Sequence, residues 1–341
     1  MYTYYSSFIS GIQDIIKNNL FDVDIIDLFD GGVLYKTNKT PDEIEKIKFF
    51  NNSFLVIQTF KNIDSESIIE STIKGTKLDN LKNVIPFIKS QKRAKTFHIF
   101  SSIENQLISV DKKVLGTFEG NLEKKLKLKV EFDKKATDFE FWFLYRSEKI
   151  GFFMLRITKN KKKLSKGELR PELTNILCLL SEPNNDDIIL DPFCGSGSIC
   201  LERSRITNFK GIFACDNNEE ITKNLKQEIK KINNKKLNKS FFVKHLDFFE
   251  NKFDDNYFTK IISDPPWGFF EKIDNIAVFY TKILKEMYRV LVKNGIIVLL
   301  SANKIEVDNI LQSMKLELKL VESYDILVSG KKAKIYKIKK I

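Results

Sequence analysis

The sequence predicts an α+β region over residues 1–158, followed by an α/β region over residues 169–341 built on a parallel sheet. Strand-like and helix-like segments alternate in the second region, which is typical of parallel strands joined by right-handed helical crossovers. The basic segment 159–168 lies between the two regions and predicts a linker, although a surface loop within one domain would have a similar composition.

The first region combines an amphipathic helix with several strands. We predict a helix over 8–19, because isoleucines recur on one face of that segment. Two adjacent glycines, Gly31 and Gly32, predict a turn into a strand. The strands predicted here are 33–35, 53–60, 96–100, 138–144 and 150–157, with a short helix over 43–48.

The second region alternates until about residue 315. Its predicted strands are 188–190, 211–215, 241–245, 260–263 and 295–300, and its predicted helices are 172–180, 197–204, 219–233 and 275–292. Two further strands, 316–327 and 333–338, then follow without a helix between them. This pattern predicts an antiparallel hairpin at the edge of the parallel sheet.

The composition excludes several classes of protein. With 341 residues, 43% of them hydrophobic, the chain can bury a core in each region. It has no apolar run near the roughly 20 residues of a membrane span and no signal-peptide pattern, so we expect a cytoplasmic protein. Four cysteines without CxxC spacing and only two histidines predict reduced thiols and no metal site.

The net charge of +12 favours a polyanionic partner. The basic excess is +3 in residues 1–158 and +9 in residues 159–341. A general bias toward Lys, Asn and Ile would produce a similar charge, so the charge by itself favours nucleic acid only slightly.

The segment Asp191-Pro-Phe-Cys-Gly-Ser-Gly-Ser198 follows a predicted buried strand and opens a helix. Gly195 and Gly197 allow a tight turn and close approach of a ligand, and the helix N-terminus favours an anionic group. The methionine carboxylate of S-adenosylmethionine suits that position, and Asp191 can accept a hydrogen bond from its ammonium group. An ordinary strand–helix turn can have the same glycine spacing.

Two further acids follow the next predicted strands. Asp216 comes 25 residues after Asp191 and can accept hydrogen bonds from both ribose hydroxyls. Asp247 can receive an adenine amino group, with Phe248 against the ring, or it can cap the helix after it. The predicted cofactor-binding residues are Asp191, Phe193, Gly195, Ser196, Gly197, Asp216, Asn217, Asp247 and Phe248.

The segment Asp264-Pro-Pro-Trp-Gly268 ends another predicted strand. An arylamine is a poor nucleophile, and a site can help it by accepting hydrogen bonds from both of its N–H groups. The Asp264 carboxylate and the Pro265 carbonyl can do so, while Trp267 can stack on a base removed from its own stack. We therefore predict Asp264, Pro265 and Trp267 as catalytic residues. A proline turn with a packed aromatic side chain is the structural alternative.

These two motifs, in this order, resemble the class I methyltransferases that modify guanine N2 in tRNA or ribosomal RNA, and more narrowly their THUMP-domain group. Leu169-Arg-Pro-Glu-Leu173 resembles the motif ahead of the cofactor turn in that group, and residues 4–20 and 134–138 resemble parts of its RNA-binding half. Trp267 stands where Tyr is commoner. The resemblance implies a Rossmann-like methyltransferase sheet, S-adenosyl-L-methionine as cofactor, and tRNA as partner of a monomeric protein.

Several other features can bind substrate or pack in the core. Arg170, Lys92 and Arg93 are candidate substrate-binding residues, although a solvated face explains the basic run 89–95 equally well. The lysines of 331–340 alternate, so we expect them to line one side of an edge strand. Trp142 is predicted to lie in the core, and Cys194 to be a packed residue.

Two other functions compete with guanine-N2 methylation. An adenine-N6 methyltransferase acting on DNA or RNA would use the same Asp-Pro-Pro-aromatic motif, because its acceptor is also an exocyclic amine. A non-catalytic RNA-binding protein could keep the fold, although the intact acids and glycines argue against it.

Overall fold

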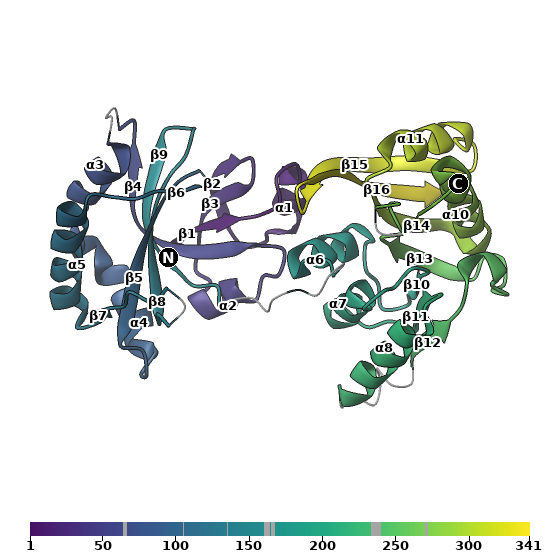
Figure 1. Cartoon of the computed structure of the whole chain (residues 1–341), viewed down its shortest axis with the longest axis horizontal. Helices are drawn as coiled ribbons and strands as arrows, with labels where there is room; N and C mark the ends of the chain where they lie inside the picture. The colour runs from purple at the N-terminus through teal and green to yellow at the C-terminus, as the bar shows by residue number, and fades with distance from the viewer. Residues whose placement is uncertain are drawn as a thin grey trace. The chain divides into compact units, whose positions relative to one another are not determined.

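The computed structural model describes residues 1–63, 67–104, 106–134, 136–159, 164, 168–232, 240–269 and 272–341. They form two compact units (Figure 1): Met1–Phe8 with Leu20–Lys161, and Ile9–Asn19 with Lys162–Ile341. Most of the predicted linker 159–168, residue 135 and the predicted helix end at 233 lie outside the described residues.

The described part of the first unit contains a nine-stranded sheet in the order β2-β3-β1-β4-β9-β8-β5-β6, with β7 paired to β5. Its strands are β1 (Tyr2–Ser7), β2 (Asp24–Phe29), β3 (Gly32–Thr37), β4 (Asn52–Lys61), β5 (Thr96–Ile103), β6 (Gln106–Leu107), β7 (Lys129–Val130), β8 (Phe139–Tyr145) and β9 (Ile150–Arg156). Its helices are α2 (Pro41–Glu45), α3 (Ile68–Lys74), η1 (Leu78–Asn83), α4 (Ile85–Ser90) and α5 (Lys112–Leu126).

Aromatic side chains form much of the core of this unit. Phe118 of α5 packs against Phe143 and Phe153, with ring centroids 5.4 Å apart in both pairs. Trp142 stacks on Phe100 at 4.6 Å and packs against a second buried cluster that includes Phe54, which confirms its predicted structural role. The five strands predicted in this region are present as β3, β4, β5, β8 and β9.

The N-terminal segment differs from the prediction. The helix predicted over 8–19 is shorter, because α1 begins only at Gln13, and residues 2–7 form β1. Gly11, with φ of 90°, sits in the turn between them. The isoleucine spacing correctly indicated burial, but a turn within the segment limits the helix to its second half. Strand β1 was not predicted, because it forms by pairing with β3 and β4, which lie further along the chain.

The described part of the second unit contains a seven-stranded sheet in the order β12-β11-β10-β13-β14-β16-β15. Its strands are β10 (Ile188–Asp191), β11 (Gly211–Asp216), β12 (Phe241–His245), β13 (Phe258–Ser263), β14 (Leu291–Ser301), β15 (Leu318–Val328) and β16 (Lys331–Lys340). Its helices are α1 (Gln13–Asn19), α6 (Pro171–Leu180), α7 (Ser198–Ile206), α8 (Glu219–Lys231), η2 (Phe248–Glu250), α10 (Ile276–Val290) and α11 (Lys304–Ser313).

The first five strands of this sheet pair in parallel, and β14–β16 and β16–β15 pair antiparallel. The α/β fold and the terminal hairpin are therefore confirmed. The predicted place of the lysine-rich strand is wrong: β16 lies between β14 and β15, and the edge strand is β15. Lys337 is buried and pairs with Glu322 and Glu182, while Lys340 donates to the main-chain oxygens of Tyr288 and Leu291.

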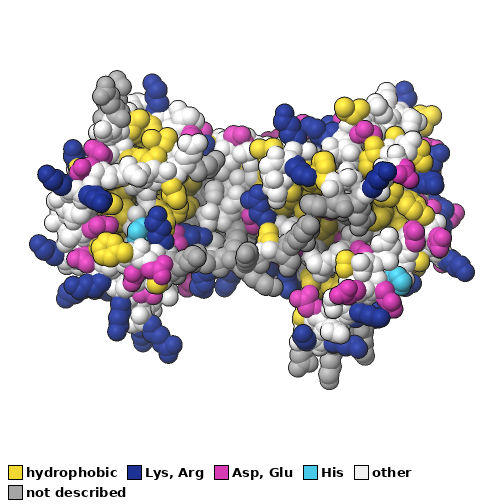
Figure 2. Space-filling view, viewed as in Figure 1, with side chains coloured by type: hydrophobic (Ala, Val, Ile, Leu, Met, Phe, Trp, Pro, Cys, Tyr) yellow, Lys and Arg dark blue, Asp and Glu magenta, His cyan; other side chains and the backbone are white. Residues whose placement is uncertain are grey.

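Charged side chains cover both units in the view of Figure 2, where basic and acidic groups are interspersed rather than gathered in one patch. In the described parts of the chain, no helix is long and apolar enough to cross a membrane.

Candidate active site

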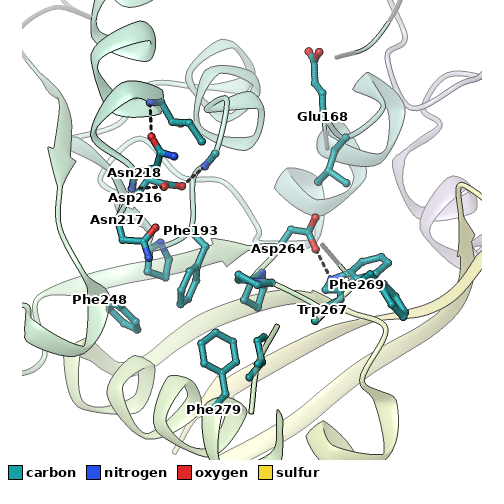
Figure 3. A pocket seen from close by; sticks show the side chains of 18 of the residues that line it. Glu168, Phe193, Asp216, Asn217, Asn218, Phe248, Asp264, Trp267, Phe269 and Phe279 are labelled. Carbon is teal, nitrogen blue, oxygen red and sulfur yellow. Dashed lines mark hydrogen bonds between the residues drawn. The ribbon is translucent and has the colours of Figure 1, made fainter. Parts of the chain in front are cut away.

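A cavity of about 680 Å³ lies in the second unit, beyond the C-terminal ends of β10, β11 and β13 (Figure 3). Strand β10 lies between β11 and β13. The chain adds β11 and β12 on one side of β10 and then β13 and β14 on the other, so the strand order reverses at β10. Ligands of open parallel sheets bind at such a reversal of strand order. The cavity is lined by residues from the glycine turn, from the ends of β11 and β12, and from the Asp264 loop.

The glycine turn adopts a backbone that other residues rarely reach. Gly195 has φ of 49° and Gly197 has φ of 78°, and α7 begins at the next residue, Ser198. A Cβ atom on Gly197 would lie 2.5 Å from Cδ1 of Leu225, whereas one on Gly195 would meet nothing within 4 Å. Gly195 lines the cavity, so its missing side chain leaves space for a ligand.

Asp191 ends β10 and is only 1% exposed. Like Ser196 and Gly197, it is not among the residues that line the cavity. Its Oδ1 accepts hydrogen bonds from Ser263 Oγ at 2.8 Å and Phe193 N at 3.3 Å. Its Oδ2 is buried and receives no hydrogen bond from the described residues. Burial raises the pKa of this carboxyl to about 7, with smaller opposing effects from the two donors. A buried carboxylate oxygen without a donor is a place for a cationic group.

Asp216 connects the end of β11 to the glycine turn. Its Oδ2 accepts from Gly195 N at 3.0 Å, and its Oδ1 accepts from Asn218 N at 2.9 Å (Figure 3). Each oxygen keeps a lone pair for a further donor. Asn217 and Asp216 both line the cavity.

Asp247 and Phe248 follow β12 and also line the cavity. Asp247 Oδ1 accepts from Phe249 N at 2.9 Å, so this side chain caps η2, which was one of its two predicted roles. Phe248 is 2% exposed and meets Phe193 with ring centroids 5.9 Å apart. Phe279 of α10 also belongs to this aromatic wall, with its ring centroid 6.2 Å from that of Phe193. This residue was not predicted from the sequence, because its place at the cavity depends on how α10 packs.

The Asp264 loop forms the other side of the cavity. Asp264 Oδ1 accepts a hydrogen bond from Trp267 Nε1 at 2.8 Å, a bond that the sequence did not predict (Figure 3). Burial raises the pKa of Asp264 to about 8; the indole N–H lowers it and the charge of Asp191 raises it further. Beyond the loop, Phe269 is 54% exposed and the Lys331 ammonium lies 3.3 Å from its ring centroid.

The predicted substrate-binding residues lie outside this cavity. Arg170 is exposed at the N-cap of α6 and is not among the lining residues, although Leu169 beside it is. Lys92 and Arg93 line another cavity, of about 550 Å³, in the first unit. Arg156 and Lys159 share that cavity with the acids Asp42, Glu45, Asp138 and Glu140.

The site has no sign of a metal ligand set. Of the residues that the structure describes, no group of three His, Cys, Asp or Glu side chains could hold an ion. The four cysteines are buried and unpaired by disulfides, and burial raises the pKa of the Cys194 thiol well above its usual range. Cys194 is therefore a packed residue, as predicted.

The parallel sheet with its antiparallel terminal hairpin, and a cavity between the glycine turn and the Asp264 loop, define a Rossmann-like methyltransferase domain. The model of the UPF0020 family, an RMKL-like methyltransferase domain, matches residues 159–333, just over half of the chain. The chain belongs to this family, and it is an S-adenosyl-L-methionine-dependent methyltransferase.

Individual proteins show the same similarity. Over 166 residues the chain is 30% identical to tRNA (guanine(10)-N2)-dimethyltransferase of Methanocaldococcus jannaschii. This match covers 46% of the chain and 45% of that protein, less than half of the relative's length.

Two solved structures share the fold along nearly the whole chain. TrmN from Thermus thermophilus superposes with a TM-score of 0.75 at 16% identity and covers 100% of both chains. SMU.472, solved in complex with SAH, has a TM-score of 0.68 at 14% identity and covers 98% of this chain and 97% of its own. At these identities the likeness concerns the fold.

Proposed function

We propose that this chain transfers a methyl group to the exocyclic N2 amine of a guanine in tRNA. The observation that carries the proposal is that one cavity brings together the Asp264-Pro-Pro-Trp267 loop, the glycine turn and Asp216. The name of the Methanocaldococcus jannaschii relative supports guanine N2 as the acceptor and tRNA as the substrate.

The residues of the glycine-turn side fit S-adenosylmethionine. Asp191 Oδ2 is buried without a donor, and the ammonium of a methionine moiety would supply one. The lone pairs that remain on Asp216 suit ribose hydroxyls, and the Phe193–Phe248 wall suits an adenine ring. We also assign contacts with the cofactor to Asn217, Ser196 and Asp247. When bound, the cofactor supplies an electrophilic methyl group.

The Asp264 side acts on the acceptor. The Asp264 carboxylate and the Pro265 carbonyl accept the two N–H groups of the amine, which orients the nitrogen and raises its electron density. The nitrogen must lose a proton as it gains a methyl group, and the ionised Asp264 carboxylate, which accepts one of its N–H groups, can take that proton. Trp267 provides an aromatic surface for the flipped base.

We assign RNA recognition to residues 1–158, as a THUMP-containing module joined by a linker over 159–168 to the methyltransferase domain 169–341. Lys92 and Arg93 line a cavity of the first unit, and Arg170 is exposed beside the linker, so all three can contact phosphates. We also propose that the protein is a monomer and that it acts in the cytoplasm.

The test is methylation of unmodified tRNA with radiolabelled cofactor, followed by digestion to nucleosides. N2-methylguanosine is expected with the wild-type protein and not with Asp264→Ala. The appearance of N6-methyladenosine would reassign the acceptor to adenine. A protein that binds the cofactor by calorimetry but methylates no tRNA would refute the proposed substrate.

A further inference from the structure

A buried tyrosine donates a hydrogen bond to the main chain of the Asp264 loop. Tyr280 of α10 is 0% exposed, and its hydroxyl has a complete set of partners. It donates to the Pro266 carbonyl at 3.2 Å and accepts from Ser301 Oγ at 2.8 Å and Asn303 Nδ2 at 3.4 Å. A hydroxyl has one proton and two lone pairs, so this arrangement uses all of them.

Asn303 holds the next carbonyl of the same loop. Its Nδ2 donates to the Trp267 carbonyl at 3.2 Å, in addition to the Tyr280 hydroxyl. Its own position is set by its main-chain N–H, which donates to Ser301 Oγ at 3.0 Å. The carbonyls of Pro266 and Trp267 are therefore both bound, one by a side chain of α10 and the other by the N-cap residue of α11. We name Tyr280, Ser301 and Asn303 the carbonyl clamp.

The clamp selects which acceptors of the loop remain for a ligand. Among the described residues, none donates a hydrogen bond to the Pro265 carbonyl, and Pro265 lines the cavity. Asp264 lies next to it, with Trp267 as its one described hydrogen-bond donor. With the two downstream carbonyls bound, the Asp264 carboxylate and the Pro265 carbonyl are left as acceptors beside the cavity.

We propose that Tyr280 and Asn303 are positioning residues for methyl transfer, which orient the loop so that Asp264 and Pro265 meet the two N–H groups of the acceptor amine. This inference rests on the proposed function in one respect, the amine with two N–H groups. Preorganised acceptors act only when they lie within a fraction of an ångström of the productive geometry. Neither residue touches the amine; both act through the loop.

The main variant is Tyr280→Phe in the full chain, which keeps the packed ring and removes the hydroxyl. Its matched control is Tyr288→Phe, two turns along the same helix, because no described residue hydrogen-bonds to the Tyr288 hydroxyl. Asn303→Ala is the second variant. Trp142→Phe serves as the background for fluorescence, since Trp267 is then the remaining tryptophan of the two.

We expect Tyr280→Phe and Asn303→Ala to lower kcat on tRNA by about 10- to 100-fold, with KM and cofactor affinity within about twofold of wild type. Acrylamide should quench Trp267 more strongly in both variants than in Tyr288→Phe, because the loop is released. Unchanged kcat and unchanged quenching in folded Tyr280→Phe would overturn the clamp. If the wild-type protein methylates no tRNA, the proposed substrate is wrong, and the quenching comparison still decides whether the clamp holds the loop.

Discussion

The two glycines of the glycine turn should respond to alanine in opposite ways. Both have positive φ, 49° at Gly195 and 78° at Gly197, but their surroundings differ. Gly195 faces open space and lines the cavity, whereas Gly197 packs on Leu225, which is 2% exposed. We therefore expect Gly195→Ala to impair cofactor binding and Gly197→Ala to impair folding.

The magnitudes follow from the geometry. Alanine in the left-handed region costs about 1–2 kcal/mol at either position. At Gly197 the new Cβ would lie 2.5 Å and 2.7 Å from the two δ-carbons of Leu225, far inside contact distance. Overpacking of that kind costs about 1–3 kcal/mol more. The free energy of unfolding should then fall by about 2–5 kcal/mol in Gly197→Ala and by about 1–2 kcal/mol in Gly195→Ala.

Binding should show the reverse order. In the proposed cofactor site the methyl group of Gly195→Ala occupies space beside the ligand, so we expect a loss of about 1–3 kcal/mol of cofactor affinity. For Gly197→Ala we expect a change in affinity of less than about fivefold. Urea unfolding and calorimetric titration of S-adenosylmethionine measure the two effects. Equal unfolding midpoints would refute the steric argument, and wild-type affinity in Gly195→Ala would show that the ligand does not contact this turn.

Four further outcomes are expected. Asp264→Ala should lower turnover by about 10²–10³-fold with cofactor affinity nearly unchanged, and Trp267→Ala should weaken binding of the target base by about 1–3 kcal/mol while Trp267→Tyr is tolerated; full activity of Asp264→Ala would exclude the mechanism. Asp216→Ala should reduce cofactor affinity by about 1.5–3 kcal/mol, because the ribose acceptor and the bonds to Gly195 N and Asn218 N are lost together; an unchanged dissociation constant would show that the pocket is misassigned. Because burial raises the folded-state pKa of Asp264 to about 8, its ionisation destabilises the wild-type fold progressively as pH rises from about 4 to about 8. In urea unfolding, the free energy of unfolding of Asp264→Asn should therefore rise relative to that of wild type by on the order of 1–3 kcal/mol between pH 5 and pH 9. A difference in unfolding free energy that does not change with pH would contradict the raised pKa.

Local chemistry made much of the second unit predictable. The motif that follows the strand ending at Asp191 and the motif that begins at Asp264 are each one uninterrupted segment of the sequence. Each contains the glycines or prolines that favour its turn. Parallel topology then brings the ends of β10, β11 and β13 to one edge, so the cavity could be expected from their order. The first unit was harder, because α5 has two interior glycines and only two buried side chains, Phe118 and Leu122, which leave a weak helical pattern.

By itself the sequence determined the α/β class, the glycine turn and the acids that follow the strands, because these depend on residue type and on periodicity over a few turns. Only the tertiary structure decided that β16 is an inner strand, that Trp267 donates to Asp264, and that Tyr280 and Asn303 donate hydrogen bonds to the carbonyls of Pro266 and Trp267. Tyr280 and Asn303 lie 14 and 36 positions from the carbonyls that they bind. Contacts at such separations arise from strand order and helix packing, and no local pattern in the sequence encodes them.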